Sequence, residues 1–284
     1  MVEWKAKTVF HAYLDEIWDS CEGVVLIKEA RSAINTNLDR QMLSHDGAAR
    51  LLVTSALSQV VKIQEAHIVR AMFMSAHAGF EQYLRSLFEA AAVSITNAKL
   101  KGSELDGNGM NRLAVLESLR GWQINLAGDA FIRYFEPLAH INVDYSRVAK
   151  AISHCEDETN FFTLEGKVFG FRVGNIDQAT VENLFKRFKC TLLWDDLTSD
   201  NSFQKLMEQT NKKDTDKELT RFMSEALKIR NRIAHTQGEI TMTKDELLKH
   251  ISFLRYVSQY LFEKLSTHVS KFVVRPGTVA KGNK

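Results

Sequence analysis

The stretch LTRFMSEALKIRNRIAHTQG, residues 219–238, decides the fold of this chain. Its apolar residues recur at steps of three and four, which is the period of one face of an α-helix. They are Leu219, Phe222, Met223, Ala226, Ile229 and Ile233. Gly238 follows shortly after the last of them, and glycine is typical just beyond a helix C-terminus. The stretch therefore predicts an amphipathic helix over residues 219–237.

A second helix is expected directly after the first. In TKDE, residues 243–246, Thr243 stands three residues before Glu246, which is the capping-box pattern of a helix N-terminus. The sequence therefore predicts a helical hairpin of residues 219–237 and 244–272, followed by a disordered tail at 273–284. Apolar residues recur at helical spacing along the second helix: Leu247, Ile251, Leu254, Val257, Leu261, Leu265 and Val269.

Helical periodicity also dominates the chain before this hairpin. The longest signal is a single apolar stripe along residues 59–97. Asp177 is in position to cap the N-terminus of a later helix. Residues 8–34 predict one or two helices. The remaining helical stretches are 112–154 and 177–188.

One segment departs from the helical pattern. NFFTLEGKVFGFRVGN, residues 160–175, is rich in Phe and Val, which favour strands, and its EGK offers a turn. It predicts a small β-hairpin inserted between helices. The expected fold class is therefore mostly α, a bundle of long helices with a small inserted β-hairpin. We divide the chain into an N-terminal helical extension at 1–58, a helical domain at 59–272 and the tail.

The composition excludes several classes of protein. The 284 residues are 45% hydrophobic and 25% charged, and a net charge of +2 is too small to indicate a nucleic-acid binder by charge alone. Cys21, Cys155 and Cys190 form no CxxC pair, which favours reduced thiols in the cytoplasm. Neither a secretory signal nor an apolar run long enough to span a bilayer is found. We therefore expect a cytoplasmic protein with no membrane partner.

Polar residues gather at the end of the predicted helix 219–237. Packing does not explain Arg230, Asn231 and His235. An arginine offers a rigid fork of donors to phosphate oxygens, and a histidine can pass a proton near neutral pH. Because RNA carries its own nucleophile in the 2′-hydroxyl, these residue types suit phosphodiester cleavage without a metal. The alternative is a helix end whose cations complement the helix dipole.

The Arg and the His do not share one helix face. Five residue steps place Arg230 and His235 about 140° apart around an ideal helix and roughly 7.5 Å apart along it. Either the long arginine side chain closes part of this gap, or a second copy of the helix in a dimer does so. The geometry thus makes a dimer part of the prediction.

Three stretches give the chain a resemblance to the HEPN superfamily. RNRIAH, residues 230–235, carries an Arg followed by a polar residue and then, after three more residues, a His. AMFMSAHAGFEQYLRSLFEAA, residues 71–91, resembles the first helix of the family. NIDQATVENLFKRFK, residues 175–189, resembles the segment before the motif in the RiboL-PSP-HEPN subgroup and related bacterial HEPN domains. The resemblance spans roughly residues 60–272.

This resemblance implies an α-helical homodimer in which two Arg/His motifs face one cleft. Many HEPN domains are metal-independent endoribonucleases that leave 2′,3′-cyclic phosphate ends, often as bacterial toxins or antiviral-defence effectors. Applied to this sequence, the resemblance implies that Arg230 stabilises the phosphate, that His235 is the acid or base and that Asn231 supports them. The resemblance implies RNA and an antitoxin or sensor protein as partners. It implies no cofactor. The alternative is a catalytically inactive HEPN module for binding RNA or protein.

Other residues are secondary candidates. Glu81 lies four residues after His77 on one helix face, either as half of a surface pair or as a support that orients the motif. Arg232 is a salt-bridge partner or a second phosphate contact. Three further cations are candidates for the RNA backbone, with a solvated face as the alternative. They are Lys186, Arg187 and Lys189.

The remaining polar patterns predict no chemistry. His67 and His77 are ten residues apart, and we interpret both as structural. The neighbours His154 and Cys155 point apart on a helix, which argues against a catalytic pair. The acids of WDDL, residues 194–197, predict a solvated loop, because nothing supplies a third metal ligand.

Overall fold

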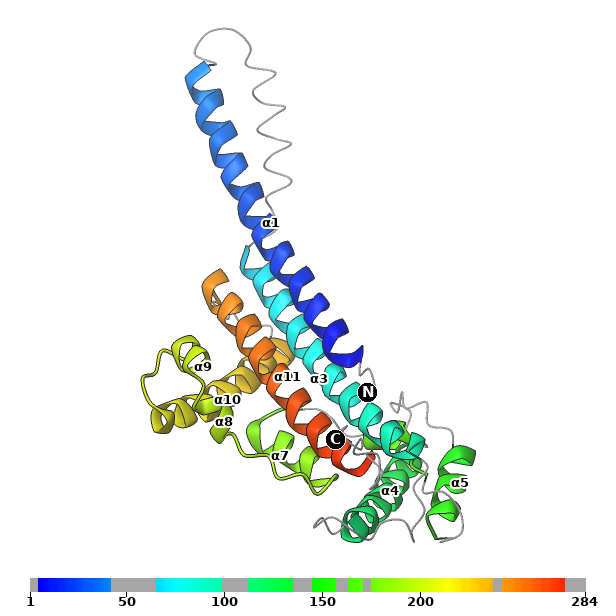
Figure 1. Ribbon diagram of the computed structural model, residues 1–284. Coiled ribbons are helices and arrows are strands. Elements are labelled where there is room, and N and C mark those ends of the chain that lie inside the picture. The colour runs from blue at the N-terminus through cyan, green and yellow to red at the C-terminus, as the bar shows by residue number, and fades with distance from the viewer. Residues whose placement is uncertain are drawn as a thin grey trace, which may run out of the picture. The chain divides into compact units, whose positions relative to one another are not determined.

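The regular structure that the computed structural model describes is helical throughout, as Figure 1 shows. The structure describes residues 5–41, 65–98, 112–134, 145–156, 163–170, 175–236 and 242–273. The mostly α fold class is thereby confirmed. The helices are α1 (Lys5–Gln41), α3 (Glu65–Asn97), α4 (Arg112–Tyr134), α5 (Tyr145–Glu156), α6 (Gly166–Phe169), α7 (Gln178–Lys186), α8 (Asp195–Thr198), α9 (Asn201–Leu206), α10 (Lys212–Thr236) and α11 (Lys244–Val273).

The chain divides into two compact units. Unit 1 comprises Met1–Phe10, Phe80–Leu227 and Tyr256–Lys284, and unit 2 comprises His11–Gly79 and Lys228–Arg255. The four longest helices each contribute a segment to both units. Unit 2 contains the whole RNRIAH motif, so the candidate site can be described within that unit.

Aromatic packing forms the core of unit 1. The ring of Phe88 on α3 lies 5.5 Å from that of Phe185 and 5.7 Å from that of Phe188, and all three side chains are fully buried. The hydroxyl of Tyr83 donates a hydrogen bond of 2.6 Å to the carbonyl of Ser258 on α11. These contacts hold α3, α7 and α11 together, because each buried ring removes a large apolar surface from water.

The predicted β-hairpin is not supported. Within its described part, residues 163–170, the chain forms the short helix α6 and no strand. Val168 packs into a buried cluster with Leu126, Ala127 and Val148. Burial of the apolar residues thus outweighed their intrinsic preference for strands. Residues 160–162 and 171–174 of the expected hairpin lie outside the described residues.

The segment around α6 docks closely onto α3. Thr96 Oγ1 accepts a hydrogen bond of 2.8 Å from the amide of Leu164. A Cβ atom added at Gly170 would lie 2.6 Å from Oε1 of Glu89 and 3.1 Å from the carbonyl of Arg85. A side chain at this position would therefore displace the Glu89 carboxylate and crowd the backbone of α3.

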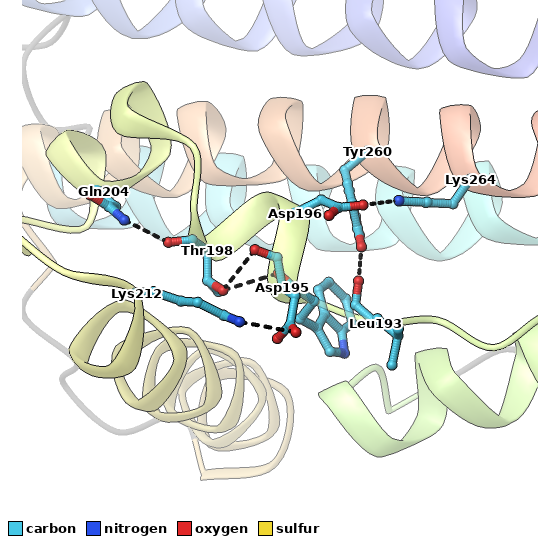
Figure 2. A network of polar contacts seen from close by, with 9 residues as sticks. Leu193, Asp195, Asp196, Thr198, Gln204, Lys212, Tyr260 and Lys264 are labelled. Carbon is cyan, nitrogen blue, oxygen red and sulfur yellow. Dashed lines mark hydrogen bonds and ion pairs between the residues drawn. The ribbon is translucent and has the colours of Figure 1, made fainter.

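The acids of WDDL are exposed, as expected, but they lie in a helix and not in a loop. Asp195 and Asp196 begin helix α8, and both are paired with lysines, as Figure 2 shows. Lys212 Nζ at the start of α10 lies 2.9 Å from Asp195 Oδ2, and Lys264 on α11 pairs with Asp196. Tyr260 donates a hydrogen bond to the carbonyl of Leu193 in the same network. These residues connect α8 with α10 and α11.

Several predicted helix ends are confirmed. Asp177 caps α7, since its Oδ1 accepts a hydrogen bond of 2.7 Å from the amide of Thr180. Thr243 and Glu246 form the capping box of α11, with the Thr243 amide 2.7 Å from Glu246 Oε2 and the Glu246 amide 3.2 Å from Thr243 Oγ1. α10 begins at Lys212, earlier than the apolar stripe, because Asn211 Oδ1 accepts a bond of 3.0 Å from the Asp214 amide.

The predicted N-terminal helices form one helix, α1, rather than two over the residues described. The start of the long stripe at 59–64, the glycine at 238 and the tail at 274–284 lie outside the described residues. No helix in the described ranges is both long and apolar enough to cross a membrane.

Candidate functional site

The motif lies at the C-terminal end of α10. Arg230 and Asn231 are half-buried neighbours, and Arg230 Nη1 donates a hydrogen bond of 3.0 Å to Asn231 Oδ1. His235 is exposed in the last turn of the helix. The amide oxygen of Asn231 thus accepts from one nitrogen of the guanidinium, whose planar fork of donors suits the binding of a phosphate.

The apolar stripe of α10 becomes less covered toward the motif. Leu219 is 0% exposed and Ala226 is 3% exposed, so the first half of the stripe is core. Ile229 and Ile233, which flank the motif, are only half-buried. The helix end therefore combines cations with partly exposed apolar side chains, a combination that is common at interfaces.

Two histidines of unit 2 lie near the motif, His250 buried and His77 half-buried. The ring of His77 on α3 lies 4.4 Å from that of Phe73 and 6.0 Å from that of His250 on α11. Phe73 also meets His250 edge to face at 4.9 Å. Phe73 is 0% and His250 is 7% exposed, so these two rings belong to the core of unit 2, and the half-buried His77 packs against them.

Burial keeps both imidazoles uncharged. It lowers the pKa of His77 from 6.5 to about 3, with smaller contributions from the charges of His250 and Arg230. The pKa of His250 falls from 6.5 to about 4, through burial and then through Lys249. The charge of Arg230 therefore contributes to the lowered pKa of a histidine on another helix.

The interpretation of His77 as structural did not anticipate the ring contacts of His77 or the nearby charge of Arg230. His77 follows Phe73 by four residues and so shares the inward face of α3. This four-residue spacing is the signal in the sequence from which the inward orientation of the His77 ring could be predicted. Its proximity to Arg230 was not predictable, because the two residues are far apart in the sequence and belong to different helices.

The other candidate residues are distributed over both units. Arg232 is exposed within the motif, whereas Glu81 is a half-buried residue of α3 in unit 1. Lys186 and Lys189 are exposed in unit 1. Arg187 is only 7% exposed, and its Nη1 donates a hydrogen bond of 2.7 Å to the carbonyl of Phe169. The guanidinium of Arg187 thus holds the segment around α6, while the two lysines are exposed and Lys186 Nζ donates a hydrogen bond of 3.3 Å to Asn183 Oδ1.

Unit 2 also has an open groove. The groove has a volume of about 500 Å³ and lies between α1 and α3, where Tyr13 donates a hydrogen bond of 3.2 Å to the carbonyl of Ser75.

Among the residues described, no group of three or more His, Cys, Asp or Glu side chains could hold a metal ion. Cys21 and Cys190 are buried and outside any disulfide.

A comparison with protein families matches the chain to one of them. The model described as RiboL-PSP-HEPN matches residues 50–267, which is most of the chain and contains the motif, α3 and most of α11. Comparisons with curated proteins and with solved structures found no match. The match agrees with the resemblance in RNRIAH and in the helices around it, and the chain belongs to the RiboL-PSP-HEPN family of the HEPN superfamily.

Proposed function

We propose that this protein is a metal-independent endoribonuclease of the HEPN type. The observation that carries the proposal is the end of α10, where Arg230 is hydrogen-bonded to Asn231 and His235 is exposed one turn further on. Membership of the family supports a nuclease or RNA-related role in general. The assignment of residues to steps is ours.

The proposed reaction uses the 2′-hydroxyl of RNA as the nucleophile. A histidine accepts the 2′-hydroxyl proton while the 2′-oxygen bonds to phosphorus, and the bond from phosphorus to the 5′-oxygen breaks. A second proton goes to the leaving 5′-oxygen, which gives 2′,3′-cyclic phosphate and 5′-hydroxyl ends. Arg230 stabilises the charge that builds up on the phosphate oxygens, and Asn231 holds the guanidinium in place.

This chemistry favours a homodimer as the active form. One imidazole cannot be both a neutral base and a protonated acid at the same moment, whereas two copies of His235 can divide these roles. Arg230 and His235 also lie about 140° apart around one helix, so a second helix can complete the site. The half-buried Ile229 and Ile233 offer apolar surface for such a contact.

Cleavage of RNA in the presence of EDTA is the direct test. The purified protein, His235→Ala and Arg230→Gln are incubated with total tRNA, and new ends are typed as cyclic phosphate or monophosphate. We expect wild-type cleavage with cyclic phosphate ends and a loss of about 10²–10⁴-fold in rate for His235→Ala. His67→Ala is the matched control, since His67 is an exposed histidine of the same unit outside the motif.

The same experiment separates the alternative function. If wild type and His235→Ala leave RNA equally intact while both bind it, the protein acts as a binding module. Cleavage that requires added Mg²⁺ contradicts the proposed mechanism.

A role as a toxin or defence effector, with an antitoxin or sensor as partner, follows only if the nuclease is active. It predicts that expression of the wild type slows bacterial growth and that His235→Ala relieves this effect.

A further inference from the structure

His77 has a buried ring nitrogen that the fold leaves unused. Its Nε2 is shielded from solvent and has no hydrogen-bond partner among the described residues. Buried polar atoms in native proteins are almost always paired, because an unpaired one keeps the full cost of leaving water. An orphaned nitrogen of this kind therefore requires an explanation, and strain reservoirs and functional sites are frequent ones.

The surroundings of His77 fix its ring and its charge. Phe73 packs on the ring at 4.4 Å, and His250 approaches it from α11 at 6.0 Å. Burial keeps the imidazole neutral, so one of its nitrogens carries a proton and the other is a hydrogen-bond acceptor. A neutral ring can lie beside a permanent cation without repulsion, and the cation near it is Arg230.

We propose that His77 is a positioning residue for Arg230, with its unpaired Nε2 accepting a hydrogen bond from the guanidinium when Arg230 binds a phosphate. Asn231 Oδ1 already accepts from Nη1 of Arg230 at 3.0 Å. A further acceptor on α3 restricts the arginine to the rotamers that aim its phosphate-binding donors in one direction. The proposal rests on the nuclease function, since it gives Arg230 the phosphate as its target.

Two substitutions at His77 separate the acceptor from the ring. His77→Phe keeps an aromatic ring against Phe73 and His250 but removes the acceptor, while His77→Gln removes the ring and places an amide oxygen near the position of Nε2. On an RNA that the wild type cleaves, we expect His77→Phe to lower kcat by about 10–100-fold with little change in KM, because a misaligned arginine mainly affects the transition state. We expect His77→Gln to recover most of the loss.

A double-mutant cycle with Arg230 tests whether the effect passes through the guanidinium. In the Arg230→Gln background, His77→Phe should cause no further loss in kcat, since there is no guanidinium left to position. Equal losses in both backgrounds would overturn the proposal. So would a folded His77→Phe with wild-type kcat, or a folded His77→Gln as slow as His77→Phe.

Nitrogen NMR of the His77 ring tests the proposal without any cleavage. The chemical shifts of the two ring nitrogens show which one carries the proton and whether the other accepts a hydrogen bond. The probe is a fully 2′-O-methylated RNA oligonucleotide, which offers phosphates but no nucleophile. We expect Nε2 to be the unprotonated nitrogen and to shift on addition of this RNA in wild type but not in Arg230→Gln.

The two proposals fail differently in these measurements. A shift of Nε2 that depends on Arg230, in a protein that leaves RNA intact, supports His77 as a positioning residue and contradicts the nuclease. Cleavage with an Nε2 that does not respond to the oligonucleotide contradicts the role of His77 and leaves the nuclease standing. A protonated Nε2 also contradicts the role of His77.

Discussion

Acidification from pH 8 to pH 5 is predicted to destabilise unit 2 through His77 and His250, whose rings pack against Phe73. The pKa of His77 is lowered from 6.5 to about 3, and that of His250 from 6.5 to about 4, both mainly by burial. At pH 5 the folded chain keeps both rings neutral, while the unfolded chain binds a proton on each. The protonation of each unfolded histidine is favourable by RT ln(1 + 10^1.5), or about 2 kcal/mol.

The sign and the pH window follow from these values. Above pH 6.5 both states are uncharged at these rings, so the pair makes no pH-dependent contribution. As the pH falls below 6.5, the unfolded state gains protons that the folded state cannot bind, and the free energy of unfolding decreases. The two rings together should lower it by about 4 kcal/mol at pH 5. The loss continues until the pH reaches the folded-state pKa values, about 4 for His250 and about 3 for His77.

Urea unfolding followed by circular dichroism measures this effect. His250→Phe keeps an aromatic ring in the cluster and removes one titrating group, so its change between pH 8 and pH 5 should be about 2 kcal/mol smaller than that of the wild type. Phe73→Leu is the matched control, because it disturbs the same cluster without removing a titrating group. It should lower stability equally at both pH values. An equal pH dependence in wild type and His250→Phe would refute the assignment of a neutral His250 to the folded state.

Three further predictions concern the ends of helices and the surface. Thr243→Ala removes the capping oxygen of α11 and should cost about 1 kcal/mol in urea unfolding, whereas Thr243→Ser should cost little; equal costs would contradict the capping role. Gly170→Ala should destabilise by about 1–3 kcal/mol, since its Cβ would meet Glu89 and the Arg85 carbonyl, while Gly128→Ala on α4 meets nothing within 4 Å and should be neutral or stabilising. If Lys186 and Lys189 contact RNA, replacing both with Gln should reduce the salt dependence of RNA binding by about 0.7 per contact in the log–log slope, and an unchanged slope excludes that surface.

Local signals in the sequence predicted the helices and their ends. The stripe from Leu219 to Ile233 and the capping box at Thr243 are properties of a few neighbouring residues, and the structure has both. The Asp177 cap is local in the same way. Such features are predictable because the hydrogen bonds and side-chain contacts that produce them lie within one or two helical turns.

The segment after α5 shows where local signals fail. Its Phe and Val residues favour strands, yet Val168 and Phe169 lie in the helix α6 and are 0% exposed. The deciding contacts come from α4 and α5, through the cluster around Leu126 and Val148. Strand propensity describes a fit to a half-buried sheet surface, and here no sheet exists among the described residues to offer it.

The candidate site divides between sequence and tertiary structure in the same way. The sequence by itself determined that Arg230, Asn231 and His235 stand on one helix end, and the residue types determined that they suit phosphate chemistry. Only the tertiary structure decided that Arg187 is held inside the fold by Phe169. It also decided that a neutral His77, on another helix, lies within reach of the charge of Arg230. Burial and charge depend on which helices pack together, and no local pattern in the chain records that choice.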